Sequence, residues 1–301
     1  MSISPNFPAC KICNSTQWDL VYSGPVRAGS FGSKTAPTEV RCCTGCGIWQ
    51  LSEDCTFGNE TYASEEYREA MGQGTEVEDF FKAHDEYQPF NILGIKGLDY
   101  RGAVVADVGC GAGSFLDHVS GLAKKIISIE PTPLYHNSLR ERGYHVYPFT
   151  SDALKVEKKC VDFVTSFQVI EHVDDPVKFL KELSEMLVDD GRIVIATPNR
   201  ADILLKLIPD EFMPFYFRSA HRWYFDQNCL TACAEKASLV VESTKFIHTF
   251  EMSNTLSWLK DKVPKGNKRL NGILPEMDQL WTTFLQASGQ ADNIYVTLKK
   301  S

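Results

Sequence analysis

The sequence lacks long apolar runs, and its basic residues are outnumbered by acidic ones. No stretch approaches the roughly 18–20 apolar residues that a membrane-spanning helix needs, so we expect no membrane partner. The 31 lysines and arginines against 39 aspartates and glutamates give a formal charge of −8. This balance argues against a nucleic-acid partner, because such proteins usually carry a basic face. Residues 1–8 show no basic start followed by an apolar stretch, so we expect a protein of the cytoplasm.

The overall composition is that of an ordinary globular protein. Apolar residues make up 43% of the chain and charged residues 23%, which excludes disordered, collagen-like and coiled-coil chains. A length of 301 residues predicts one large domain accompanied by a small one.

Cysteine is abundant, and its placement is informative. Six of the ten cysteines fall in the first 55 residues. Two Cys-x-x-Cys turns stand there, Cys10–Cys13 and Cys43–Cys46, the second followed by a glycine. Two such turns present four thiolates to one ion, so we predict a closed, structural zinc site. Cys42 could replace Cys43 at a spacing of three, and buried free thiols remain the alternative.

From residue 103 onward, strand-like and helix-like segments alternate, which indicates a parallel sheet covered by helices. The predicted strands are 103–108, 125–130, 145–147, 161–167, 192–197, 239–247 and 292–298. The predicted helices are 77–87, 114–119 and 176–188, with two amphipathic stretches at 252–262 and 274–286.

A glycine-rich turn follows the first of these strands. Gly109, Gly111 and Gly113 come directly after Asp107, and glycines let a backbone approach a ligand closely. Glu130 ends the next strand, where an acid can bind both hydroxyls of a ribose. The glycine turn and this acid together predict a nucleoside-containing cofactor. The third glycine comes one residue too early for the dinucleotide fingerprint.

These motifs resemble class I S-adenosylmethionine-dependent methyltransferases between residues 103 and 198. The resemblance implies an α/β, Rossmann-like sheet of seven strands whose last strand is antiparallel and lies between the fifth and the sixth. It also implies that Asp107 and the three glycines hold the methionine end of S-adenosylmethionine. Asp152 and Ala153 would contact adenine, and Phe167 and Gln168 would lie beside the sulfonium.

The resemblance also predicts how the chain is organised. A zinc-ribbon-like module would occupy 1–58, a helical connector 59–100, and the methyltransferase core 101–249 and 290–301. Residues 250–289 would form a helical insertion before the last strand. This insertion would either cover the substrate pocket or form the surface of a homodimer.

Two histidines are candidates for accepting the proton of the substrate, one of them paired with a glutamate. His172 is the first, because its reference pKa is near 6.5 and Glu171 is adjacent. His221 is the second, in a segment where substrate-covering loops usually lie. Arg218 and Arg222 flank it and could hold phosphate or carboxylate groups. Packing or solvated positions are the alternative for all of these residues.

A zinc module ahead of this core resembles bacterial methyltransferases that act on nucleotide-linked sugars. That resemblance implies a small-molecule substrate, such as a nucleotide-linked or phosphorylated sugar, and Tyr62 or Tyr67 as substrate-binding residues. Two other hypotheses are an O-methyltransferase of an aromatic, quinone-type metabolite and a zinc-ribbon methyltransferase of a macromolecule. The motifs leave carbon, oxygen and nitrogen acceptors open.

Overall fold

The computed structural model describes residues 7–29, 33–56, 76–266 and 268–301. Two sheets organise these residues, one of seven strands and one of four. Within the described ranges, no helix is both long and apolar enough to cross a bilayer.

The large sheet has the strand order β10-β11-β8-β7-β4-β5-β6. Its strands are β4 (Val104–Val108), β5 (Lys125–Ile129), β6 (His145–Tyr147), β7 (Val161–Phe167), β8 (Leu187–Pro198), β10 (Leu239–Ile247) and β11 (Asn293–Lys300). From β6 to β8 all neighbours are parallel. β11 is antiparallel to both β8 and β10, which confirms the predicted place and direction of the last strand.

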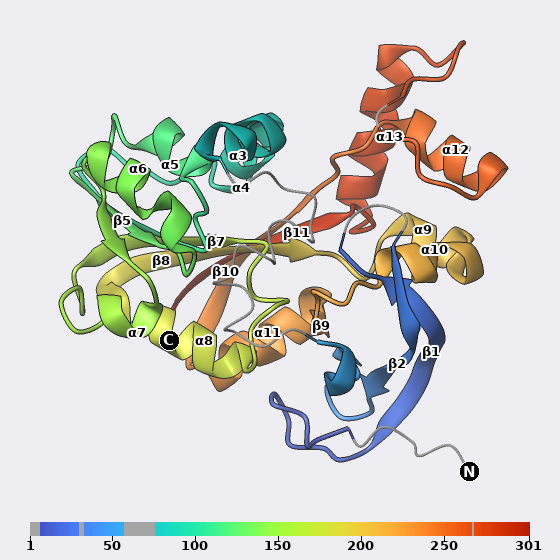
Figure 1. Cartoon of the computed structure of the whole chain (residues 1–301), viewed down its shortest axis with the longest axis horizontal. Helices are drawn as coiled ribbons and strands as arrows, with labels where there is room; N and C mark the ends of the chain where they lie inside the picture. Colours follow the sequence, from blue (N-terminus) through green and yellow to red (C-terminus); the bar gives the residue numbers. More distant parts are fainter. Residues whose placement is uncertain (1–6, 30–32, 57–75, 267) are drawn as a thin grey trace.

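Helices cover both faces of this sheet (Figure 1). One layer holds α3 (Val77–His84), α4 (Gln88–Gly94), α5 (Ser114–Val119) and α6 (His136–Glu141), and the other holds α7 (Thr150–Ala153), α8 (Pro176–Met186) and α11 (Gln227–Lys236). β8 contributes side chains to the hydrophobic cores on both faces of the sheet, because successive side chains of a strand point to opposite faces. Ile193 and Ile195 join the cluster that contains α8 and α11. Val194 and Ala196 join the cluster that contains α5.

Two predicted helices end earlier than expected. The helix from Pro176 begins at a cap, where the Asp175 carboxylate accepts a hydrogen bond from Lys178 N at 2.9 Å. It ends at Met186 and not at 188, because Leu187 pairs with Val161 and starts β8. The predicted helix 77–87 ends at His84, and a 3-10 turn over Asp85–Tyr87 leads into α4.

The small sheet is antiparallel and contains β1 (Trp18–Arg27), β2 (Lys34–Cys43), β3 (Trp49–Leu51) and β9 (Trp223–Tyr224). β9 lies between β8 and β10 in the sequence, far from the N-terminal strands, and it pairs with β3. Tyr224 of this strand packs with Val26, Val40, Leu51 and Phe217 in a core of its own. The N-terminal strands are therefore completed by a segment of the large domain.

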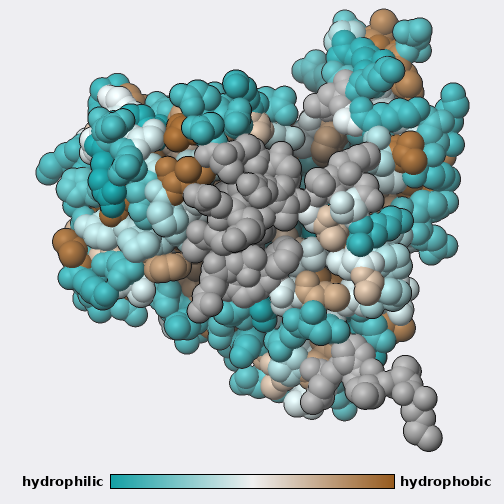
Figure 2. All heavy atoms as spheres, in the orientation of Figure 1, coloured by the Kyte–Doolittle hydropathy of each residue, from teal (hydrophilic) through white to brown (hydrophobic). Residues whose placement is uncertain are grey.

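An arm of two helices, α12 (Met252–Asp261) and α13 (Pro275–Ala287), precedes β11 and matches the predicted amphipathic stretches. Trp258 and Leu285 are buried against α9 (Ile203–Leu207) and α10 (Pro209–Tyr216). Leu280 and Phe284 are exposed. Figure 2 shows such hydrophobic residues scattered among hydrophilic ones on the arm.

Candidate functional site

The site lies at the carboxyl ends of β4 and β7, where the order of the parallel strands reverses. From β4 the chain proceeds to β5 and β6 on one side, and β7 and β8 lie on the other. Ligands of open α/β sheets bind in the crevice at such a switch point. The glycine turn follows β4 and the Glu171–His172 pair follows β7, so the fold brings both predicted motifs to this crevice.

The glycine turn depends on backbone conformations that only glycine adopts readily. Gly109, Gly111 and Gly113 have φ of +77°, +56° and +87°, in the left-handed region. A Cβ on Gly111 would lie 2.2 Å from the ring of Phe80 on α3. Any side chain there would therefore both strain the backbone and displace α3.

Glu130 is held against the glycine turn. Its carboxylate is buried and accepts hydrogen bonds from Gly111 N at 2.8 Å and Thr132 N at 2.9 Å. This contact ties the end of β5 to the turn after β4. It places a buried carboxylate beside the glycine turn, and its role in binding a ribose stays a prediction.

Asp107, at the end of β4, is the second buried acid of this crevice. Thr165 Oγ1 donates a hydrogen bond to it at 2.7 Å. Burial raises the pKa of Asp107 to about 7, and the nearby charge of Glu130 adds to this effect. Two acids beside a glycine turn suit a ligand that carries positive charge, such as the sulfonium and amino groups of an adenosyl amino acid.

The other predicted cofactor residues line the same edge or lie next to it. Gln168 follows Phe167 directly after β7 and has φ +58°, a conformation that is uncommon for non-glycine residues. Its side chain donates to Asn293 Oδ1 at 2.9 Å. Asp152 and Ala153 are on the short helix α7. Asp152 pairs with Lys155 at 2.8 Å, and Ala153 is buried.

Glu171 has a buried carboxyl group, of which one oxygen accepts a hydrogen bond from a side chain. Thr197 Oγ1 donates to its Oε2 at 2.9 Å, while its Oε1 has no hydrogen-bond partner among the described residues. Burial raises its pKa to about 7, although Thr197 and the charge of Arg218 act in the opposite direction. Near neutral pH this carboxyl group is therefore partly protonated, whereas an ordinary surface glutamate is ionised.

His172 and His221 lie beside Glu171. The rings of the two histidines are perpendicular, with centroids 4.8 Å apart. His172 Nδ1 is 2.6 Å from the carbonyl oxygen of Ala220. A carbonyl only accepts, so Nδ1 carries the proton and the lone pair of a neutral His172 is on Nε2. That nitrogen is 3.9 Å from Glu171 Oε1.

His221 is buried, and its environment keeps it neutral. Burial lowers its pKa well below the usual value, and the charges of His172, Arg218 and Arg27 lower it further. Glu171, His172 and His221 offer three ligand atoms within 4.8 Å of one another, a set that could also hold a cation. The charges of Arg218 and Arg27, which act on His221, would repel such a cation. We refer to the three residues as the Glu171–His172–His221 cluster.

The comparison with known proteins agrees with this site. A family model described as a methyltransferase domain matches residues 91–244, just over half of the chain. The match contains the glycine turn, Glu130 and the Glu171–His172 pair. The chain belongs to this methyltransferase family. One of its relatives is named as a probable S-adenosylmethionine-dependent methyltransferase, and the glycine turn with Glu130 fits that cofactor.

Three curated relatives share the central part of this methyltransferase. A probable S-adenosylmethionine-dependent methyltransferase of Mycobacterium tuberculosis is 32% identical over 98 residues, 32% of this chain and 36% of that protein. A ubiquinone biosynthesis O-methyltransferase of Parvibaculum lavamentivorans is 32% identical over 100 residues, 31% of this chain and 40% of that protein. A tRNA U34 carboxymethyltransferase of Colwellia psychrerythraea is 33% identical over 107 residues, 33% of each. The methyltransferase thus spans less than half the length of these relatives.

A solved structure shows the same fold. The chain is similar to a SAM-dependent methyltransferase of Thermotoga maritima, described as a possible histamine N-methyltransferase. The TM-score is 0.51 at 22% identity, covering 74% of this chain and 94% of the other. At this identity the similarity concerns the architecture.

The predicted substrate-binding residues of the methyltransferase have different surroundings. Arg222 forms ion pairs with Asp174 at 3.0 Å and Glu53 at 3.3 Å. Arg218 has no carboxylate partner among the described residues. Tyr62 and Tyr67 lie outside the described residues. Arg27, at the end of β1, was missed by sequence reasoning, since nothing in a strand of the N-terminal module connects it with residues near 218.

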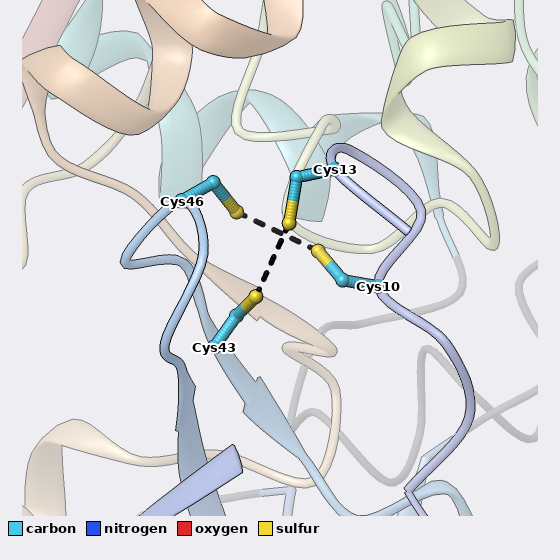
Figure 3. A group of neighbouring side chains, drawn as sticks. All are labelled: Cys10, Cys13, Cys43 and Cys46. Atoms are coloured by element: carbon cyan, nitrogen blue, oxygen red, sulfur yellow. Dashed lines mark hydrogen bonds between the residues drawn. The ribbon is translucent and has the colours of Figure 1, made fainter. Parts of the chain in front are cut away.

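The four predicted metal ligands of the methyltransferase converge on one point (Figure 3). Cys10 Sγ is 3.5 Å from Cys46 Sγ, and Cys13 Sγ is 3.4 Å from Cys43 Sγ. All four sulfurs lie within 4.8 Å of one another, and no disulfide joins them. Zinc bound tetrahedrally at 2.3 Å separates its thiolates by roughly 3.8 Å, so the donor set and its spacing fit this ion.

Cys42 lies outside this group. Its Sγ donates to the carbonyls of Cys43 and Gly47 at 3.7 and 3.6 Å. Successive residues of β2 point to opposite sides, so Cys43 and Cys42 cannot face one ion together. The geometry favours Cys43, as the regular spacing does.

Glu171→Gln is expected to stabilise the methyltransferase at pH 8 relative to wild type. The folded-state pKa is about 7 against a reference of 4.5. The stability contributed by the bound proton is therefore fully present below about pH 4.5 and is lost as pH rises through 7. A shift of this size corresponds to about 3 kcal/mol at most. Urea denaturation at pH 5 and pH 8 should show the stability difference between variant and wild type growing with pH.

The matched control for this variant is Glu185→Gln, because Glu185 is exposed and pairs with Lys158 on the surface. Its stability relative to wild type should be nearly the same at both pH values. A Glu171→Gln difference that does not change between pH 5 and pH 8 would contradict the raised pKa.

Proposed function

We propose that this enzyme transfers a methyl group from S-adenosylmethionine to a small polar acceptor, a nucleotide-linked or phosphorylated sugar. The observation that carries the proposal is the buried Glu171–His172–His221 cluster beside the glycine turn. When bound, the cofactor supplies an electrophilic methyl group on a sulfonium. The residues of the chain would orient the acceptor, exclude water and take its proton.

His172 is the proposed proton acceptor. The hydrogen bond from its Nδ1 to the Ala220 carbonyl fixes the ring and leaves the basic lone pair on Nε2. Glu171 Oε1, 3.9 Å from that nitrogen, would stabilise the imidazolium that forms. The neutral His221 would then hydrogen-bond the acceptor without adding a charge.

The polarity of this cluster supports a polar acceptor over an aromatic one. A buried carboxyl oxygen and the buried His221 Nδ1 have no hydrogen-bond partner among the described residues. Buried polar atoms of this kind need partners. A sugar carries hydroxyls around its whole ring, whereas a catechol or quinol offers hydroxyls only at its substituted positions and is apolar over the faces of its ring.

We further propose that Cys10, Cys13, Cys43 and Cys46 bind a structural zinc ion. Four thiolates complete a tetrahedron, so no position is left for a substrate. The ion would join the turn that precedes β1 to the turn between β2 and β3.

A methyl-transfer assay with three classes of acceptor tests this function. The enzyme would be incubated with S-adenosylmethionine labelled in its methyl group and with nucleotide sugars and sugar phosphates, catechols and quinols, or bulk tRNA. We expect label in the first class alone. Label in the quinol or tRNA fraction, with none in the sugars, would replace the proposed acceptor by one of the other two hypotheses.

A further inference from the structure

Two arginines meet where the small sheet joins the methyltransferase domain. Arg27 ends β1, and a parallel β-bridge pairs it with Arg218 beyond α10. Arg27 N donates to Phe217 O at 3.0 Å, and Ser219 N donates to Arg27 O at 2.9 Å. Residues paired directly in a bridge project to the same face of the ladder. The two side chains therefore start from the same face, close enough for the charge of Arg218 to act on Arg27.

Neither guanidinium group is neutralised within the described part of the chain. No carboxylate there lies within ion-pair distance of Arg27 or Arg218, and the buried Arg27 Nε has no acceptor. The neighbouring arginines differ, since Arg200 pairs with Asp226 and Arg222 with two acids. Burial together with the charge of Arg218 lowers the pKa of Arg27 to about 10. The fold thus holds two like charges together, which is unfavourable unless an anion joins them.

The surroundings orient these groups for a ligand. The Arg27 guanidinium lies over the ring of Phe215, 4.2 Å from its centroid, which fixes its plane. Ser219, next to Arg218, is buried, and its hydroxyl has no partner among the described residues. Two guanidinium forks and one hydroxyl form a set of donors without an acceptor.

This set of donors adjoins the Glu171–His172–His221 cluster. The charge of Arg218 acts on Glu171, and both arginines act on His221. His221 N donates to Arg218 O at 3.0 Å. An anionic group held by the arginines would therefore lie next to the acceptor atom, on the side of the small sheet.

We propose that Arg27 and Arg218 bind a phosphoryl group of the methyl acceptor. Planar guanidinium groups match the oxygens of a phosphoryl group in pairs, and two positive charges suit a dianion. The cysteine-rich module then supplies a substrate-binding residue to the methyltransferase site. This inference rests on the proposed function, since it names the group by which the polar acceptor is recognised.

Titration calorimetry on the full chain loaded with S-adenosylhomocysteine tests the proposal. The probes are inorganic pyrophosphate, uridine diphosphate, glucose 1-phosphate and, as a dicarboxylate, malonate. We expect binding of at least one phosphoryl compound, which weakens as salt is added, and weaker binding of malonate. Pyrophosphate, uridine diphosphate and glucose 1-phosphate distinguish a nucleotide-linked from a phosphorylated acceptor.

Arg27→Gln and Arg218→Gln should each weaken binding of the phosphoryl probe roughly 10- to 100-fold, because each removes charge-assisted hydrogen bonds. Affinity for S-adenosylhomocysteine should stay unchanged in both. The matched control is Arg192→Gln, since Arg192 pairs with Glu242 at 2.7 Å, away from the site, and should bind the probe as wild type does.

Three results would overturn the inference alone: cofactor binding without any phosphoryl binding in wild type, tighter binding of malonate, or phosphoryl binding that neither arginine variant weakens. The first two need no variant and stand even if a variant fails to fold. Absence of S-adenosylhomocysteine binding would overturn the proposed function, and the inference with it.

Discussion

Cys43→Ser is expected to remove bound zinc from the chain and to unfold the small sheet, whereas Cys42→Ser should retain both. Cys43 Sγ faces the other three thiols, and the Cys42 thiol faces two backbone carbonyls. Structural zinc contributes about 10–16 kcal/mol of apparent binding free energy in small modules. Loss of one ligand of four should therefore lower the melting temperature of the module far more than an ordinary point mutation does.

The measurement is zinc content by elemental analysis together with thermal denaturation of both variants. We expect one zinc per chain in wild type and in Cys42→Ser, and substantially less than one in Cys43→Ser. Equal zinc content in the two variants, or loss in Cys42→Ser alone, would contradict the assignment of the ligands. Wild-type protein without zinc would contradict the metal site altogether.

Loss of zinc should also reduce methyl transfer, because the small sheet adjoins the candidate active site. β9 pairs with β3, and Arg222 N and Trp223 N both donate to Glu171 O, at 2.8 and 3.0 Å. Trp223 Nε1 adds a hydrogen bond to Val173 O at 2.8 Å. The loop that carries Glu171 and His172 is therefore hydrogen-bonded to the segment that forms β9 of the small sheet, and the four cysteines lie at the end of the same sheet.

His172→Ala is expected to lower turnover about 10²- to 10⁴-fold, the range for loss of a general base. Affinity for S-adenosylhomocysteine should stay within about twofold of wild type, because His172 is not among the predicted cofactor residues. A steady-state methyl-transfer assay and calorimetry on the same preparation separate the two effects.

The control for this variant is His118→Ala, since His118 is exposed on α5 and should leave turnover unchanged. Unchanged turnover in His172→Ala would remove this residue from the proposed chemistry.

Much of the large domain could be predicted from local patterns. Its strands are short, apolar and separated by turns, so alternation alone indicated a parallel sheet. The glycines at 109, 111 and 113 and the acid at 130 were placed in one crevice because the carboxyl ends of neighbouring parallel strands meet at one edge. The Cys-x-x-Cys spacing likewise predicted which four thiols converge.

The missing parts depend on contacts between distant segments. β9 has two residues, Trp223 and Tyr224, too few to show any periodicity, and it is a strand only because β3 lies beside it. Arg27 likewise pairs with Arg218 through a β-bridge between segments that are distant in the sequence. The stack of Phe80 on Gly111 also depends on tertiary contact. The predicted helix extended to residue 188, but Leu187 pairs with Val161 and begins β8 instead.

The central claim is that the glycine turn and the Glu130 carboxylate bind S-adenosylmethionine, and calorimetric titration with S-adenosylhomocysteine tests it most directly. Wild type should bind one equivalent, Glu130→Gln should bind roughly 10- to 100-fold more weakly through loss of a charged acceptor, and Glu185→Gln should match wild type. No heat and no thermal shift in wild type at millimolar ligand, or equal affinity in Glu130→Gln, would contradict the claim.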